Sequence, residues 1–146
     1  MPQGGTITPA SMLPMILFAV VFGPVAGMIA GVGYGLLQLI QDPYVVHWAQ
    51  LLLDYPLAFG AIGMAGLSRN NIPVAVLIGG FGRFLMHFIS GFVFFGSYAP
   101  PGSNVIMYSL VYNGVSIGVE VGICLVVSFL PVISTALNRI RKEMIV

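Results

Sequence analysis

Long apolar runs separated by short polar breaks make up most of the chain. Each long run is close to the 20 or so residues that an α-helix needs to cross a bilayer. The runs predict five transmembrane helices, at residues 12–22, 24–40, 45–67, 72–95 and 105–137. The first run is short and contains Pro14, which fits a short or broken helix, or a hairpin with the second run. We therefore expect an all-α integral membrane protein, with residues 1–146 forming a single transmembrane helical domain.

Composition supports this class. Hydrophobic residues make up 58% of the chain and charged residues 6%, whereas a soluble domain carries about 25% charged residues. So few charges cannot cover a surface that faces water. The sequence contains no nucleotide-binding P-loop, no CxxC pair and no HExxH metal motif, so we expect neither an enzyme nor a cofactor, metal or nucleic acid.

Positive charges predict the orientation. Arg69 lies in one loop, and Arg139, Arg141 and Lys142 follow the last predicted helix. Two predicted helices separate these positions, so they lie on one side, which the positive-inside rule makes the cytoplasm. We therefore expect a cytoplasmic C-terminus, with residues 1–11 and the loops at 41–44 and 96–104 outside.

The second predicted helix carries glycine at every fourth position: Gly23, Gly27, Gly31 and Gly35. This spacing makes a ridge of small residues along one helix face. Because lipid gives helices no hydrophobic reason to associate, such ridges allow close backbone packing. Packing inside the bundle is the favoured interpretation, and docking of a partner subunit is the alternative.

Polar residues recur at helical spacing in three of the predicted helices. They are His47, Gln50 and Asp54 in the third, Arg83 and His87 in the fourth, and Ser109, Asn113, Ser116 and Glu120 in the fifth. Each set shares one helix face. Polar faces within a membrane point into the bundle or into a wet cavity.

The helical rise sorts these residues by depth. Asp54, His87 and Asn113 lie about 12–13 Å from the outer ends of their helices, and Tyr108 is higher. These four residues can therefore reach one pocket in the outer half of the bundle. Arg83 and Glu120 lie deeper, at roughly 18 and 24 Å. We expect them to form a buried ion pair, with a proton relay as the alternative.

Asp54 then needs a positive partner, because an ionised carboxylate is costly within a bilayer. His87 and Arg83 are two candidates, and a cationic ligand is the third. Aromatic residues near the outer helix ends favour a ligand, although some of them can belong to the interfacial belt. They are Tyr34, Tyr44, Trp48, Tyr55, Phe94, Phe95, Tyr98, Tyr108 and Tyr112.

Several segments together resemble one family of vitamin transporters. They are MPQGGTITPASMLPMILFA, YGLLQLI, DPYVVH, AQLLLDYPLAFG, GRFLMHFISG, FFGSYAP and YSLVYNG. In unbroken order up to about residue 120, they resemble the thiamine-specific substrate-binding subunit (S component) of energy-coupling factor transporters. That family has six helices. The resemblance implies that this chain supplies helices 2–6 and lacks the usual first helix, and we interpret it as a fragment.

The resemblance also implies ligand, partners and location. It implies thiamine binding from the extracellular side of a bacterial cytoplasmic membrane, with a transmembrane coupling subunit and two cytoplasmic ATPase subunits as partners. The implied ligand-binding residues are Asp54, Tyr55, His87, Phe95, Tyr108, Asn113 and Tyr44.

Each of these residues has an implied role. Asp54 would offset the thiazolium charge, Phe95 and Tyr108 would stack on a ring, and Asn113 would read the pyrimidine edge. His87, Tyr55 or Tyr44 would hold the hydroxyethyl end. The alternatives are an S component for a thiamine precursor or another vitamin, and a stand-alone ion-coupled carrier that uses Arg83, Glu120 and His87.

Overall fold

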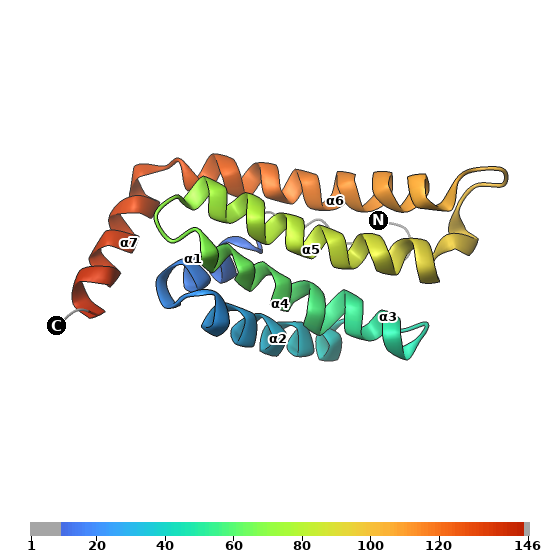
Figure 1. Cartoon of the computed structure of the whole chain (residues 1–146), viewed down its shortest axis with the longest axis horizontal. Helices are drawn as coiled ribbons and strands as arrows, with labels where there is room; N and C mark the ends of the chain where they lie inside the picture. Colours follow the sequence, from blue (N-terminus) through green and yellow to red (C-terminus); the bar gives the residue numbers. More distant parts are fainter. Residues whose placement is uncertain (1–9, 145–146) are drawn as a thin grey trace.

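The computed structural model describes residues 10–144, and every regular element among them is a helix (Figure 1). Four helical segments are long and apolar enough to cross a membrane: α2 (Pro24–Gln41), the segment Trp48–Leu67, α5 (Ile72–Phe94) and α6 (Val105–Ser128). The first predicted helix, α1 (Leu13–Phe22), is shorter. The all-α membrane class is therefore confirmed. Residues 1–9 of the predicted outer segment lie outside the described residues.

The four long segments pack in the order α2, Trp48–Leu67, α5 and α6, and α1 contacts α2 and α5 near one end. Side-chain oxygens of Asn71 and Asn104 accept hydrogen bonds from backbone N–H groups in the first turns of α5 and α6. Such caps satisfy donors that a helix start leaves without a partner. The polar breaks in the sequence thus fix where these two helices begin.

The segment Trp48–Leu67 changes its winding along its length. It begins as α3 (Trp48–Leu52), passes through a π-helical turn (Leu53–Leu57), continues as α4 (Ala58–Ile62) and ends in a 3₁₀ turn (Gly63–Leu67). Pro56 lies in the π-helical turn and has no N–H to donate. Asp54 and Tyr55 belong to the same turn, and such π turns are frequent at functional sites.

The prediction that one helix runs over residues 105–137 is wrong. Helix α6 ends at Ser128, and a separate helix α7 (Pro131–Met144) follows after Phe129 and Leu130. Pro131 explains the break, because proline cannot donate an N–H and disfavours helical geometry in the residue before it. In Figure 1, α7 turns away from α6 and crosses the end of the bundle.

The predicted start of the third helix, at residue 45, is also wrong. His47 precedes the first helical residue, and its Nδ1 accepts a hydrogen bond from the backbone N–H of Ala49. The imidazole is exposed and stacks on Phe94 at 5.0 Å between ring centroids. His47 therefore does not share the inward polar face of Gln50 and Asp54.

The glycine ridge packs inside the bundle, as the favoured interpretation predicted. A Cβ added to Gly27, Gly31 or Gly35 would clash with the backbone or small side chains of residues 19 and 55–63. Gly23 departs from the pattern, because its added Cβ would meet open space. Its φ of +93° instead makes the sharp link between α1 and α2.

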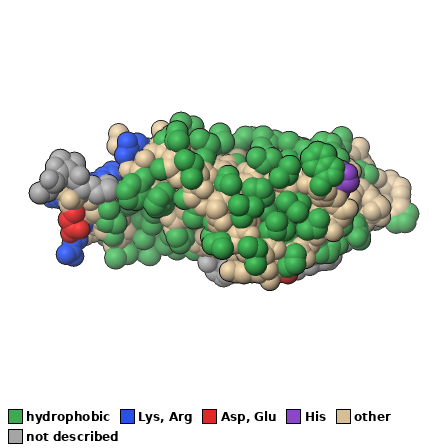
Figure 2. All heavy atoms as spheres, turned by 90° about the horizontal axis from the view of Figure 1, so that it is seen from below, with side chains coloured by type: hydrophobic (Ala, Val, Ile, Leu, Met, Phe, Trp, Pro, Cys, Tyr) green, Lys and Arg blue, Asp and Glu red, His purple; other side chains and the backbone are tan. Residues whose placement is uncertain are grey.

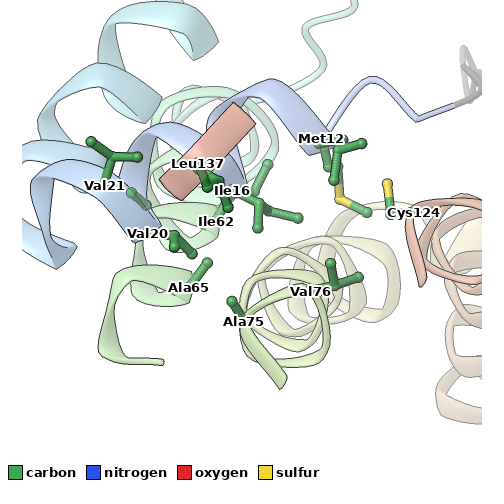
Figure 3. Packing of buried hydrophobic residues seen from close by; sticks show 12 residues of the cluster. Met12, Ile16, Val20, Val21, Ile62, Ala65, Ala75, Val76, Cys124 and Leu137 are labelled. Atoms are coloured by element: carbon green, nitrogen blue, oxygen red, sulfur yellow. The ribbon is translucent and has the colours of Figure 1, made fainter. Parts of the chain in front are cut away.

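A small hydrophobic core lies around α1 (Figure 3). Its fully buried members include Met12, Ile16, Val20, Ile62, Val76 and Cys124. The face shown in Figure 2 is also largely apolar, with Lys and Arg gathered at one end. Arg69 and Arg141 lie together there, since the Arg141 guanidinium donates to the Arg69 carbonyl. The predicted common side of these cations agrees with this contact.

Substitution of Gly31 by alanine tests the ridge. The added methyl group would meet the Phe59 backbone, and we expect Gly31→Ala to lower the free energy of unfolding by about 1–3 kcal/mol. Gly33→Ala on the same helix is the matched control, because its Cβ would meet nothing within 4 Å. That change should stabilise the helix by about 0.5–1 kcal/mol. Unfolding in mixed micelles measures both, and equal effects would contradict ridge packing.

Candidate binding site

A cavity opens between the segment Trp48–Leu67, α5 and α6. All seven residues proposed from the sequence line it: Tyr44, Asp54, Tyr55, His87, Phe95, Tyr108 and Asn113. They come from the loop before α3, from the π-helical turn, from α5 and the residue after it, and from α6. The fold thus brings together side chains that lie up to 69 positions apart (113 − 44 = 69).

Asp54 is the centre of a hydrogen-bond network. Its Oδ2 accepts from Gln50 Nε2 at 2.7 Å and from Ser90 Oγ at 2.9 Å. Its Oδ1 lies 3.0 Å from His87 Nδ1. Gln50 and Ser90 are each only 1% exposed, so this network belongs to the interior of the bundle. Three donors therefore fix the carboxylate, and two of them carry no charge.

Gln50 also connects Asp54 to the loop before α3. Its Nε2 donates to the Tyr44 carbonyl at 3.0 Å, and its Oε1 accepts from the Val46 N–H at 3.0 Å. Gln50 therefore links the loop backbone to the Asp54 carboxylate. Helical spacing in the sequence puts Gln50 on the polar face but does not identify it as a site residue.

The second carboxylate has a full positive partner. Arg83 Nη1 lies 2.9 Å from Glu120 Oε2, which confirms the expected ion pair and shows that Arg83 is not paired with Asp54. Ser11 also donates to Glu120, and the Arg83 guanidinium carbon lies 4.9 Å from the Phe59 ring centroid. Both charged residues line the same cavity as Asp54. Within residues 10–144, only His87 offers Asp54 a possible cationic partner.

Aromatic rings flank the loop side of the cavity. Phe95 lies between Tyr44 and Tyr98, with centroid distances of 6.1 and 6.0 Å. The Tyr44 and Tyr98 hydroxyl oxygens are 3.4 Å apart, and this hydrogen bond is the main reason that the pKa of Tyr44 is raised above its usual value. Tyr44 therefore stays a neutral phenol at physiological pH.

Tyr55 and Asn113 hold the walls of the cavity in place. The Tyr55 hydroxyl donates to the Asp42 carbonyl at 2.9 Å and accepts from the Tyr44 N–H at 2.8 Å. Asn113 Nδ2 donates to the carbonyl oxygens of His87 and Ser109, at 3.2 and 3.1 Å. These bonds tie the loop to the π-helical turn, and α5 to α6.

Four of the aromatic candidates are not part of the cavity lining, and one of them, Tyr98, contacts it through Phe95. Trp48 is 70% exposed, Phe94 stacks on His47, and Tyr34 packs on Phe59 and accepts a hydrogen bond from Gln38. Exposed aromatic residues at helix ends fit the interfacial belt. The ring cluster at the cavity is therefore smaller than the full aromatic set.

Ser90 is the site residue that the sequence analysis missed outright. It follows His87 by three positions, so the helical spacing that links Arg83 to His87 also puts Ser90 on their face. A lone serine in an apolar run gives only a weak signal, because serine can hydrogen-bond to its own helix backbone. Its contact with Asp54 depends on how the two helices pack.

These features define a class of protein: a helical membrane bundle with an internal polar cavity, in which a carboxylate and aromatic rings can receive a small polar or cationic molecule. The chain matches the thiamine transporter protein family (Thia_YuaJ) over residues 1–139, and it belongs to that family. Membership confirms the family that the sequence resembles. It also confirms a transporter component rather than an enzyme.

Individual relatives agree. Thiamine transporter ThiT of Bacillus subtilis (strain 168) is 38% identical over 144 residues, covering 87% of this chain and 74% of that protein. Thiamine transporter ThiT of Lacticaseibacillus paracasei is 35% identical over 123 residues, covering 70% and 61%. A solved structure of ThiT from Listeria monocytogenes matches with a TM-score of 0.78 and 27% identity, covering 91% of this chain and 84% of that one.

Removal of one charge from the deep pair should be costly. Glu120→Gln leaves Arg83 without its counter-charge inside the bundle, and we expect the free energy of unfolding to fall by about 3–5 kcal/mol. Glu143→Gln is the matched control, because the Arg139–Glu143 pair is exposed and should contribute less than about 1 kcal/mol. Equal losses in mixed-micelle unfolding would mean that burial adds nothing to the Arg83–Glu120 pair.

Proposed function

We propose that this chain is the substrate-binding membrane subunit of a thiamine uptake transporter, and that it captures thiamine in the cavity around Asp54. The observation that carries the proposal is the state of the Asp54 carboxylate. It is fixed by Gln50, Ser90 and His87 inside an apolar bundle, yet no Arg or Lys of the described residues pairs with it. Family membership supplies the ligand that fits this charge.

The charge argument rests on how the carboxylate is compensated. Gln50 and Ser90 solvate Asp54 with neutral dipoles, which lowers the cost of burial without cancelling the charge. The thiazolium ring of thiamine carries a permanent positive charge. In a bundle of low dielectric constant, a cation beside Asp54 gains far more than it would in water. Asp54 therefore favours a cationic ligand over a neutral analogue of the same shape.

The other lining residues supply shape and direction. Phe95 and Tyr108 stack on the rings of thiamine, and an aromatic face also attracts a cation. Asn113 reads the pyrimidine edge through hydrogen bonds. His87, Tyr55 or Tyr44 would hold the hydroxyethyl end. These roles carry the family's ligand set onto residues that line one cavity.

The direction of capture follows from the distribution of charge. The aromatic and loop residues of the cavity lie near the start of α3, whereas Arg69 and α7 lie at the opposite end of the spanning helices. The positive-inside rule assigns the basic end to the cytoplasm. Thiamine would then enter from outside, in a bacterial cytoplasmic membrane. The Arg83–Glu120 pair would form the inner floor of the cavity.

Import requires energy. The given sequence contains no motif for ATP hydrolysis. The sequence has no P-loop, and the glycine-rich stretch Gly79–Gly82 lies within α5 and follows no strand. We propose that a transmembrane coupling subunit and two cytoplasmic ATPase subunits supply the driving force. This chain would then provide substrate recognition.

Substitution of the central carboxylate tests the proposed function. Asp54→Asn keeps the size of the side chain but removes the charge, and we expect thiamine to bind roughly 30-fold or more weakly. Calorimetric titration of detergent-purified protein measures this change. Asp42→Asn is the matched control, because that residue is exposed at the cavity rim and the effect should be at most about five-fold.

A neutral analogue separates charge from structure. An analogue with thiophene in place of thiazolium should bind the unaltered protein more weakly than thiamine does, and Asp54→Asn should barely change its affinity. Equal losses for both ligands would instead mean that Asp54 only maintains the fold of the site. No loss for either ligand would remove Asp54 from the binding site.

Phe95 tests the aromatic contribution. Phe95→Leu removes the ring, and we expect thiamine affinity to fall by about two- to thirty-fold, whereas Phe95→Trp should raise it because tryptophan is the best cation–π partner. Phe92→Leu makes the same change outside the cavity, where Phe92 packs on Phe88 at 5.3 Å. Similar effects at positions 92 and 95 in the same titration would contradict ring stacking.

A further inference from the structure

Helix α7 has an apolar side that the bundle covers only in part. Leu137 is 3% exposed, and Ile133 packs against the hydrophobic core. Next to them on the helix, Val132 remains 65% exposed and Ile140 43% exposed. Phe129, just before α7, is 72% exposed. An exposed apolar strip therefore runs along the helix and continues the apolar surface of the spanning helices.

Basic residues border this strip, and they differ in what they contact. Arg69 donates to the carbonyl oxygens of Val20 and Val21 at the end of α1, and Arg141 donates to the Arg69 carbonyl. These contacts anchor α7 to the bundle. Arg139 and Lys142 are exposed. Arg139 forms a surface ion pair with Glu143, at 3.1 Å.

The position of α7 puts the apolar strip at the edge of the membrane. Two residues separate α7 from α6, which is long enough to span a bilayer, and α7 crosses the end of the bundle (Figure 1). The strip and its cations therefore lie where the spanning helices leave the hydrocarbon. Headgroup phosphates occupy this level, and basic amphipathic helices bind there by combining apolar burial with charge attraction.

We propose that α7 is an interfacial helix that binds anionic phospholipid headgroups through Arg139 and Lys142, with Phe129, Val132 and Ile140 inserted among the acyl chains. Charge complementarity favours anionic lipid over zwitterionic lipid. Continuity of the strip with the lipid-facing surface favours lipid over a soluble partner. Bound lipid would hold α7 in the membrane plane and keep its anchor on Arg69 in place.

The single tryptophan of the chain makes a direct test possible. Trp48 lies at the start of α3, at the other end of the bundle from α7, and is exposed. Trp48→Phe combined with Phe129→Trp moves the only reporter to the base of α7. The protein is reconstituted in mixed phosphatidylcholine and phosphatidylglycerol vesicles, with bromine on one lipid or the other. The ratio of fluorescence quenching gives the preference for the anionic lipid at the reporter.

We expect a preference of about five-fold or more at position 129, because one basic residue near an anionic surface accounts for roughly that factor. Arg139→Gln with Lys142→Gln should bring the preference close to one, and Glu143→Gln should raise it by freeing Arg139. Trp48 in the unaltered protein is the matched control and should show no preference. Retained thiamine binding reports that each variant is folded.

Three results would overturn the proposal. One is an equal preference at positions 48 and 129, which would mean a general effect of vesicle charge. Another is a preference that survives the double substitution, which would exclude Arg139 and Lys142. The third is weak quenching by both lipids at position 129, which would mean that protein, such as a second copy of the chain, covers this strip. Strong quenching at position 129, with a preference for the anionic lipid that depends on Arg139 and Lys142, supports the proposal.

Discussion

A carboxylate inside a bilayer must be compensated, and this constraint organises the whole structure. Two of the four acidic residues lie inside the bundle, Glu120 buried and Asp54 partly buried, and they are compensated differently. Glu120 forms an ion pair with the Arg83 guanidinium, so its charge is neutralised within the protein. Asp54 receives two neutral donors and one imidazole. The difference separates a structural pair from a carboxylate that can still bind a cation.

The scaffold around Asp54 depends on close helix packing. Gly31 and Gly35 let α2 approach the backbone at residues 55–60, and Gly91 lets α5 approach Ser109 and Asn113 on α6. The π-helical turn around Pro56 presents Asp54 and Tyr55 on a backbone that departs from regular α geometry. Small residues and one proline thus set the position of the carboxylate, and the larger polar side chains then fix its orientation.

Much of this arrangement could be predicted from the sequence. Apolar run lengths give the spanning helices. The helical rise puts Asp54 level with His87, and it puts Arg83 and Glu120 together in the deeper half, because depth follows from residue number. Rotation about the helix axis is harder. The π-helical turn shifts the helical register after Leu52. His47 caps α3 and is not part of the helix, but a capping residue cannot be told from a helical residue by its spacing in the sequence. The periodicity therefore puts His47 on the wrong face.

The interactions that sequence periodicity cannot supply are those between helices. Ser90 reaches Asp54 only because α5 packs beside the π-helical turn. The end of α6 at Ser128 is different, because Pro131 is a local signal for it in the sequence. A structure of the protein with thiamine bound tests the central claim most directly. The account predicts the ligand in the cavity, with its cationic ring or exocyclic amine in contact with the Asp54 carboxylate. Thiamine bound elsewhere, or with its charge facing away from Asp54, would contradict it.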